Sequence, residues 1–227
     1  MKTIIHFEDL KRSDYKEVWD YQESLLQKVI SQKENQQTHK INYLLFCEHP
    51  HVFTLGKNGN VSNLLANSKV LKEIDAVFCK TNRGGDITYH GPGQIVVYPI
   101  IDLEEAGIGI KKYIWSLEES VILTLKCFGI KGERLKGATG VWLNADIPGK
   151  TRKICAIGVR TSKFVTMHGF ALNVNTDLKY FLFINHCGFV DKGVTSMQKE
   201  LGKTQSVEDV KKYLKHYLAL LLNLDIQ

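Results

Sequence analysis

Residues 83–94 read RGGDITYHGPGQ and lead into an apolar run, QIVVYPI, at residues 94–100. Its four glycines give the backbone conformational freedom, and its one proline restricts it. Arg83, Tyr89 and His90 add polar side chains to the same stretch. A tight turn explains the first pair of glycines, but it does not explain the polar residues between the glycines. The spacing also differs from the G-x-G-x-x-G of a dinucleotide fingerprint, and a strand rather than a helix follows. The stretch therefore predicts a loop that serves a ligand and then enters a sheet.

The length and composition are those of an ordinary globular chain. The 227 residues are 44% hydrophobic, and neither a repeat nor a linker divides them, so we expect a single domain over 1–227. No apolar run approaches the roughly 20 residues of a membrane span, and the N-terminus carries acids where a signal peptide is apolar. Five cysteines lack the spacing of a disulfide framework, which predicts free thiols in a cytoplasmic protein.

The formal charge of +6 reflects 30 Lys and Arg residues against 24 Asp and Glu residues. The basic residues are dispersed among acids, and no aromatic–basic RNA motif is present, so nucleic acid is not the expected partner. Either an acidic protein or an anionic ligand fits this balance.

Helices and strands follow from the spacing of the apolar residues. Ser13 is the predicted cap of a first helix, a second spans about 109–128 and stops at Gly129, and a third starts at Ser206. Apolar runs predict strands at residues 43–47, 52–56, 76–80, 94–100, 140–144, 153–160, 170–175 and 180–184. Short turns, such as residues 146–149, join several of these runs into hairpins. An α+β fold, with a mixed, largely antiparallel sheet and flanking helices on one side, is therefore favoured over a doubly wound parallel sheet.

Three tempting motifs fail on spacing. Residues 149–151 and 202–204 both read Gly-Lys-Thr, like the end of a P-loop, but neither has the required glycine five positions earlier. Cys47, His49 and His51 would share one face of an extended strand, but Pro50 interrupts it and no fourth ligand is near. We expect neither a nucleotide nor a metal at these positions.

Among the cysteines, Cys187 has the context of a nucleophile. Cys47, Cys79 and Cys127 lie inside apolar runs, where a thiol is most often a small buried hydrophobic group. Cys187 instead follows a predicted strand and precedes Gly188, whose backbone N–H is approachable for an oxyanion.

A thiol near pKa 8.5 needs a positive neighbour or a base in order to react at neutral pH. His186 is adjacent to Cys187, but neighbouring residues on an extended chain point to opposite sides. Lys153 and His168 are better candidates, and Lys153 opens a mostly apolar strand in which a lysine is unusual. The alternative for Lys153 is an exposed residue at a strand end.

Four blocks together indicate a family. They are EHPHVFTLGK at 48–57, RGGDITYHGPGQIVVYPI at 83–100, KICAIGVR at 153–160 with MHGFALNVN at 167–175, and CGFVDKGVTSM at 187–197. In this order they resemble, over about residues 40–200, the octanoyltransferases of lipoate synthesis, also called lipoyl(octanoyl) transferases. The resemblance implies the fold shared by biotin and lipoate protein ligases.

The resemblance also implies a reaction and its residues. The octanoyl group of octanoyl-acyl carrier protein moves to a lysine of an apo-lipoyl domain of a 2-oxoacid dehydrogenase or of the glycine-cleavage H protein. Cys187 falls on the family's acyl-thioester cysteine and Lys153 on its activating lysine, and no ATP, cofactor, metal or membrane is involved. The implied substrate-binding residues are Arg83, Gly84, Gly85, Asp86, Ile87, Thr88, Tyr89, His90, Ala156, Ile157, Gly158, Gly169, Phe170 and Ala171.

Two residues depart from the family pattern. His186 stands where a proline usually precedes the catalytic cysteine, and Cys155 stands two positions after Lys153, where a small unreactive residue is common. Strand alternation would put Cys155 on the same face as Lys153, which predicts a competing thiol near the site.

Two alternatives stay open at this stage. One is an ATP-dependent lipoate or biotin ligase on the same fold, which would form an adenylate and need no cysteine. The other is a non-catalytic acyl-binding or scaffold protein that has kept the pocket. Adenylate formation identifies the first, and a turnover assay with both protein substrates excludes the second.

Overall fold

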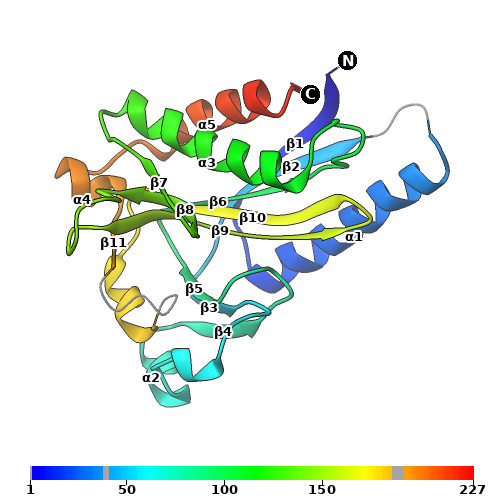
Figure 1. Cartoon of the computed structure of the whole chain (residues 1–227). Helices are drawn as coiled ribbons and strands as arrows, with labels where there is room; N and C mark the ends of the chain where they lie inside the picture. Colours follow the sequence, from blue (N-terminus) through cyan, green and yellow to red (C-terminus); the bar gives the residue numbers. More distant parts are fainter. Residues whose placement is uncertain (1, 38–40, 186–191) are drawn as a thin grey trace.

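The fold is built on one mixed sheet, which crosses the middle of Figure 1. The computed structural model describes residues 2–37, 41–185 and 192–227. The strand order is β12-β1-β2-β6-β10-β9-β8-β7, and β11 pairs with β9. The strands are β1 (Thr3–Arg12), β2 (Asn42–Glu48), β6 (Gln94–Ile100), β7 (Glu133–Leu135), β8 (Ala138–Leu143), β9 (Arg152–Ser162), β10 (Val165–Asn173), β11 (Gly193–Val194) and β12 (Leu224–Ile226). Only the pairs β1–β12, β1–β2 and β9–β11 are parallel among these described strands, which confirms the mixed, largely antiparallel sheet.

A second, three-stranded sheet lies below the main sheet in Figure 1. Its order is β4-β3-β5, formed by β3 (Val52–Leu55), β4 (Val77–Lys80) and β5 (Ile87–His90). The helix α2 (Ser68–Glu73) and the 3₁₀ helices η1 (Val61–Asn63) and η2 (Leu178–Phe183) flank it. Phe53, Ile87, Tyr89 and Phe181 belong to its own small core.

Helices cover both faces of the main sheet, as Figure 1 shows. On one face α3 (Ile110–Cys127) and α5 (Val207–Leu221) pack on the strands, and on the other lies α1 (Tyr15–Glu34). The short helix α4 (Met197–Leu201) precedes α5. No helix in the described ranges is both long enough and apolar enough to cross a membrane.

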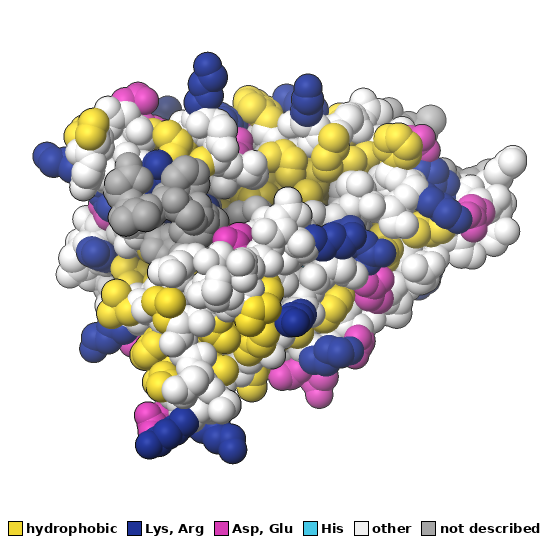
Figure 2. Space-filling view, turned by 60° about the horizontal axis from the view of Figure 1, so that its bottom comes forward, with side chains coloured by type: hydrophobic (Ala, Val, Ile, Leu, Met, Phe, Trp, Pro, Cys, Tyr) yellow, Lys and Arg dark blue, Asp and Glu magenta, His cyan; other side chains and the backbone are white. Residues whose placement is uncertain are grey.

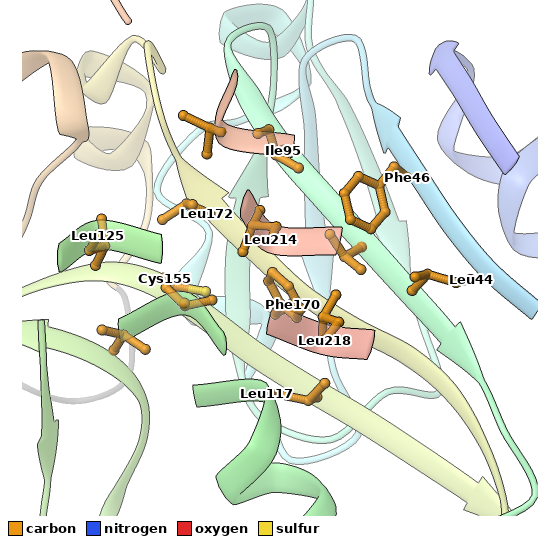
Figure 3. Packing of buried hydrophobic residues seen from close by; sticks show 14 of the residues in the cluster. Leu44, Phe46, Ile95, Leu117, Leu125, Cys155, Phe170, Leu172, Leu214 and Leu218 are labelled. Carbon is orange, nitrogen blue, oxygen red and sulfur yellow. The ribbon is translucent and has the colours of Figure 1, made fainter. Parts of the chain in front are cut away.

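The expectation of helices on one side was therefore wrong, and the strand sequences show why. In β2, Leu44 and Phe46 contribute to the core under α3 and α5, whereas Leu45 and Cys47 contribute to the core under α1. A strand that is apolar at successive positions has two faces to bury, because its side chains alternate. Figure 3 shows the first of these cores, where Phe46 and Phe170 of the sheet lie near Leu117, Leu214 and Leu218.

The ends of the long helices agree closely with the sequence. The cap of α1 is Asp14 rather than Ser13, because the Asp14 carboxylate accepts hydrogen bonds from the N–H groups of Lys16 and Glu17. The helix α3 is followed by Gly129 at φ 77°, and the Ser206 hydroxyl caps α5 by accepting from the Asp209 N–H. The second and third predicted helices are thus confirmed.

One predicted strand is not a strand. Residues 180–184, YFLFI, lie mostly in η2, whose first turn is capped by Asp177. Phe181 packs into the small core while the side chain of Leu182 is 77% exposed. The apolar run is therefore only partly buried, and it does not form a strand with a buried face. The opposite error concerns β1, which the apolar pattern did not identify, because only Thr3 and Ile5 are buried in it and the other residues are partly or fully exposed.

Close backbone packing between β10 and β6 generates a stability prediction. A Cβ atom at Gly169 would overlap the Val97 carbonyl oxygen and lie 2.8 Å from Pro99 Cδ. We expect Gly169→Ala to lower the free energy of unfolding by about 3 kcal/mol, since overpacked cores typically lose 1–3 kcal/mol or slightly more. Gly109→Ala is the matched control, because a Cβ there meets nothing within 4 Å. Urea denaturation that finds the two variants equally stable would contradict this packing.

Candidate active site

A cavity of about 270 Å³ lies between the two sheets, on the face of the main sheet that also carries α1. Strands β5, β6, β9 and β10 supply most of its wall. All residues that the resemblance assigns to substrate binding line it, except Gly84 and Tyr89. Figure 2 shows a hollowed face of the molecule with hydrophobic side chains inside the hollow and Lys and Arg side chains around it. The motif segments, far apart in the sequence, thus meet at one place.

The loop after β4 is held by contacts between backbones. Gly84 N–H donates to the Val159 carbonyl at 3.0 Å, and a Cβ at Gly158 would lie 2.7 Å from the Gly84 oxygen. On the other side, a Cβ at Gly56 would overlap the Gly85 oxygen. Gly84 is therefore a spacer between the sheets rather than part of the cavity wall, and only glycine at 56 and 158 permits this approach.

Arg83 is largely buried, and its guanidinium anchors the same loop. It donates to the Thr54 carbonyl at 2.6 Å and to the Thr54 hydroxyl at 2.9 Å, and to the Gly84 carbonyl at 3.0 Å. These bonds tie the loop to β3, so part of the role of Arg83 is to hold the cavity wall in place. Its charge also lies close enough to lower the pKa values of two cavity histidines.

Tyr89 points away from the cavity into the core of the small sheet. Its hydroxyl lies 2.7 Å from His51 Nδ1, and its ring stacks on Tyr180 at 4.8 Å. The expectation that Tyr89 lines the path of the acyl group was therefore wrong. On β5 the neighbouring His90 side chain faces the cavity instead, as alternation along a strand requires.

His90 is a buried, neutral hydrogen-bonding residue. Burial, and after it the charges of His49 and Arg83, lower the pKa of His90 to about 3. Its Nδ1 lies 2.8 Å from Gln94 Oε1, and the Gln94 amide donates to Asn173 Oδ1 at 2.8 Å. Since Oε1 is the acceptor of Gln94, His90 Nδ1 carries the proton, and its Nε2 is left as an acceptor towards the Thr54 hydroxyl at 3.3 Å.

His168 is strained as well as neutral. Its φ is 59°, which is uncommon outside glycine, and it lines the cavity. Burial, followed by the charges of Arg83 and Arg160, lowers the pKa of His168 to about 3. Its Nε2 donates to Asn82 Oδ1 at 2.6 Å, which leaves Nδ1 a buried acceptor with no hydrogen-bond partner among the described residues.

Lys153 lies in the cavity wall on β9. Its Nζ is 4.5 Å from the centre of the Trp142 ring, a cation–π distance. The Lys153 backbone is fixed by β11, because Val194 pairs with it and Thr195 N–H donates to its carbonyl at 2.9 Å.

Cys187 and His186 lie outside the described residues. The chain is anchored before them by the bond from Asn185 N–H to the Asn63 carbonyl at 2.8 Å.

Cys155 does not compete at the cavity. It is fully buried in the core with Leu125 and Leu172, as Figure 3 shows, and burial raises the pKa of its thiol. The alternation argument failed because β9 contains a bulge. Val141 pairs with Cys155 but Trp142 pairs with Lys153, so Ile154 is an extra residue and the faces change between 153 and 155.

Several cavity residues were missed by sequence reasoning. They are Tyr15, Gln94, Val96, Tyr98, Ala138, Thr139, Asn173, Phe181 and Val194. Asn173 could have been predicted, because it belongs to the ALN of the block at 167–175. The cavity residues on strands could not, because the sequence does not show which face of the sheet they occupy. His49, considered above for a metal, instead binds the Ser13 carbonyl and the Tyr98 hydroxyl, each at 2.8 Å. No group of three potential metal ligands occurs in the part of the chain that the structure describes.

The buried histidines predict acid sensitivity. His49, His90 and His168 have pKa values lowered from 6.5 to about 4, 3 and 3, so below pH 6.5 the unfolded chain binds protons that the folded chain does not. The free energy of unfolding should therefore fall as pH drops from 6.5 towards 4, by up to about 1.4 kcal/mol per histidine and pH unit. Urea denaturation at several pH values measures this slope. His168→Asn, in which asparagine tolerates the positive φ, should make the free energy of unfolding depend less on pH. A slope equal to that of the wild type would contradict the lowered pKa of His168.

Known proteins resemble this chain over almost its whole length and not only at the motifs. Residues 14–219 match the lipoyl protein ligase A/B catalytic domain. The chain is 50% identical to an octanoyltransferase of Bacteroides fragilis over 224 residues, which cover 98% of this chain and all of the relative. It is 53% identical to an octanoyltransferase of Flavobacterium psychrophilum over 227 residues, which cover 97% of each.

Solved structures share the fold at low sequence identity. A chain from the Thermoplasma acidophilum lipoylation system, described as a bipartite lipoate protein ligase with its E2 lipoyl domain, is 16% identical with a TM-score of 0.70, and covers all of this chain and 86% of that chain. A biotin protein ligase from Aquifex aeolicus is 12% identical with a TM-score of 0.51, covering 98% of this chain and 71% of that chain. These likenesses confirm the predicted fold. Together with the sequence relatives, they lead to one conclusion: the chain belongs to the lipoyl protein ligase A/B catalytic-domain family and, within it, to the octanoyltransferases.

Proposed function

We propose that this octanoyltransferase takes its acyl group from octanoyl-acyl carrier protein and holds it as a thioester on Cys187. It then passes the group to a lysine of an apo-lipoyl domain, in a 2-oxoacid dehydrogenase or the glycine-cleavage H protein. The observation that carries the proposal is the cavity with Lys153 in its wall, in a chain half identical to named octanoyltransferases. The role of Cys187 rests on the family resemblance.

The cavity suits a hydrocarbon chain. Ile87, Val96, Ile157, Ala171 and Phe181 present apolar surface, and the buried histidines are neutral because of their lowered pKa values. Each methylene removed from water contributes about 0.8 kcal/mol, so an eight-carbon chain gains several kcal/mol from such a wall. This gain is available to the donor complex and to the acyl-enzyme alike.

The first half of the reaction forms the acyl-enzyme. The Lys153 ammonium stabilises the Cys187 thiolate, which attacks the thioester carbonyl of the donor. A tetrahedral oxyanion forms and collapses, the new carbon–sulfur bond is retained, and the carrier protein leaves as a thiolate that takes up a proton. One thioester replaces another, so the step is nearly thermoneutral and needs no ATP.

The second half transfers the acyl group to nitrogen. The neutral amine of the lipoyl-domain lysine attacks the Cys187 thioester, loses a proton, and expels the Cys187 thiolate. Amide formation from a thioester is downhill, so again no adenylate is required. We infer that the reaction takes place in the cytoplasm, where reducing conditions keep a nucleophilic thiol free.

A covalent intermediate is the sharpest prediction. Octanoyl-acyl carrier protein without an acceptor should add one octanoyl group to the protein, labile to hydroxylamine and located on the peptide that contains Cys187. Apo-lipoyl domain should then discharge it. Intact-mass spectrometry follows both steps, and Cys187→Ser should prevent loading or trap a slower oxygen ester.

Cys155→Ala is the control for this experiment, because the Cys155 thiol lies in the core with a raised pKa. Loading should persist in this variant. Transfer that survives Cys187→Ala but not Cys155→Ala would show that the nucleophile is misassigned. Octanoyl-adenylate made from ATP would favour a ligase instead.

The role of Lys153 is tested through the thiol that it is proposed to activate. Lys153→Ala should raise the pKa of the Cys187 thiol and slow its alkylation at pH 7 by roughly tenfold, with partial recovery in base. Peptide-resolved alkylation across a pH series measures this. The exposed Lys150 provides the control substitution Lys150→Ala. An alkylation profile shared by all three proteins would show that Lys153 does not activate the Cys187 thiol.

A further inference from the structure

We infer that a groove beside the catalytic cavity binds the phosphopantetheine arm of the acyl donor, an inference that rests on the proposed function. The groove has a volume of about 680 Å³ and lies between α3 and the β7–β8 hairpin. Ala138 and Thr139 line both the groove and the cavity that contains Lys153. The two hollows therefore adjoin at β8, and an extended ligand in the groove has a direct route to the cavity.

The groove combines apolar surface with positive charge. Trp115 is 37% exposed and Ile110 is 42% exposed, and both line the groove with Ile114 and Leu135. Exposed apolar side chains gathered around a groove are typical of a binding surface rather than of a plain solvated face. Lys111 and Lys136 stand at its rim, and neither forms an ion pair within the described residues.

The acids in and beside the groove are paired with one arginine. Arg134 donates to Glu118 at 2.9 Å and to Glu119 at 2.7 Å, and it also donates to the Trp115 carbonyl at 3.0 Å. Glu118 in turn accepts from the Gly140 N–H at 3.0 Å. These bonds fasten the β7–β8 hairpin to α3, so the groove is a preformed site. Arg134, Lys111 and Lys136 together outweigh the two carboxylates, so the groove keeps a positive balance of charge.

Two cations contact the Trp115 ring. Lys112 Nζ lies 3.8 Å from the ring centre and Arg134 Cζ lies 4.8 Å from it. Such contacts fix the indole in place before a ligand arrives, which lowers the entropy lost on binding. Tryptophan and arginine are enriched among the residues that contribute most to binding at interfaces, and Trp115 and Arg134 lie together here.

The chemistry of the donor fits this surface better than that of the acceptor. A carrier protein presents its acyl group at the end of a long arm, with an anionic phosphodiester at one end and amide and methylene groups along its length. Lysines recognise phosphate as point charges, and the apolar floor accommodates the arm. The acceptor presents only a lysine side chain, which is short and positively charged, so the groove is both too extended and of the wrong charge for it.

The test compares donors that differ only in the phosphate. Octanoyl-phosphopantetheine should load Cys187 with a kcat/KM roughly fivefold above that of octanoyl-pantetheine, and Lys111→Ala with Lys136→Ala should bring both donors to the slower rate. Loading from octanoyl-acyl carrier protein should fall in the same double variant, while discharge of preloaded enzyme to apo-lipoyl domain keeps its rate. Lys69→Ala with Lys72→Ala, two exposed lysines on α2, is the matched control.

Two outcomes would overturn the inference while leaving the proposed function intact. One is a phosphate advantage that survives in the double variant. The other is normal loading with slowed discharge, which would assign the groove to the lipoyl domain. A wild-type enzyme that loads from none of these octanoyl thioesters would instead refute the proposed function itself.

Discussion

The contact between Gly84 and β9 is the constraint on which the rest of the site depends. The Gly84 N–H bond to Val159 and the close approach of the Gly84 oxygen to Gly158 set the distance between the loop and the main sheet. The Gly85 oxygen is equally close to Gly56 on the small-sheet side. Any side chain at 56 or 158 would push the two sheets apart. The cavity between them therefore owes its dimensions to backbone packing rather than to the side chains that line it.

A buried polar network then connects this frame to β9, the strand that carries Lys153. His90 binds Gln94, Gln94 binds Asn173, and the Asn173 amide donates to the Thr195 carbonyl at 3.0 Å. Thr195 is itself bonded to the Lys153 backbone. Buried networks that are fully satisfied rigidify a site, because each member would lose a hydrogen bond by moving. The loop that carries the family motif and the strand that carries Lys153 are consequently fixed relative to each other.

Much of this arrangement was available from the sequence, because apolar runs and motif blocks are local signals. The strand at 94–100 and the helix ending before Gly129 followed from such patterns, and the family resemblance pointed to the segment 83–90, which lines the cavity except at Gly84 and Tyr89. The features that could not be predicted depend on contacts between residues that are far apart in the sequence. The run at 180–184 forms a 3₁₀ helix because of how Phe181 packs on the small sheet.

Strand faces show the same limit. The bulge at Ile154 separates Lys153 from Cys155, and a register shift of one residue reverses every later assignment of face. Tyr89 and His90 are adjacent, and only the finished sheets decide which of them faces the cavity. The neutrality of His90 and His168 is likewise a product of burial, to which sequence spacing gives no access.

The pairing of β12 with β1 has a consequence for how the molecule is made. Thr3 pairs with Leu224 and Ile5 with Ile226, so β1 finds its outer neighbour in a segment that is made much later than β1 itself. Until then the backbone N–H and C=O groups along that side of β1 have no strand to bind, and an exposed strand edge of this kind pairs readily with other chains. Contacts of such high sequence separation also form slowly. During synthesis this edge is therefore open to pairing with other chains until β12 has left the ribosome and has paired with β1.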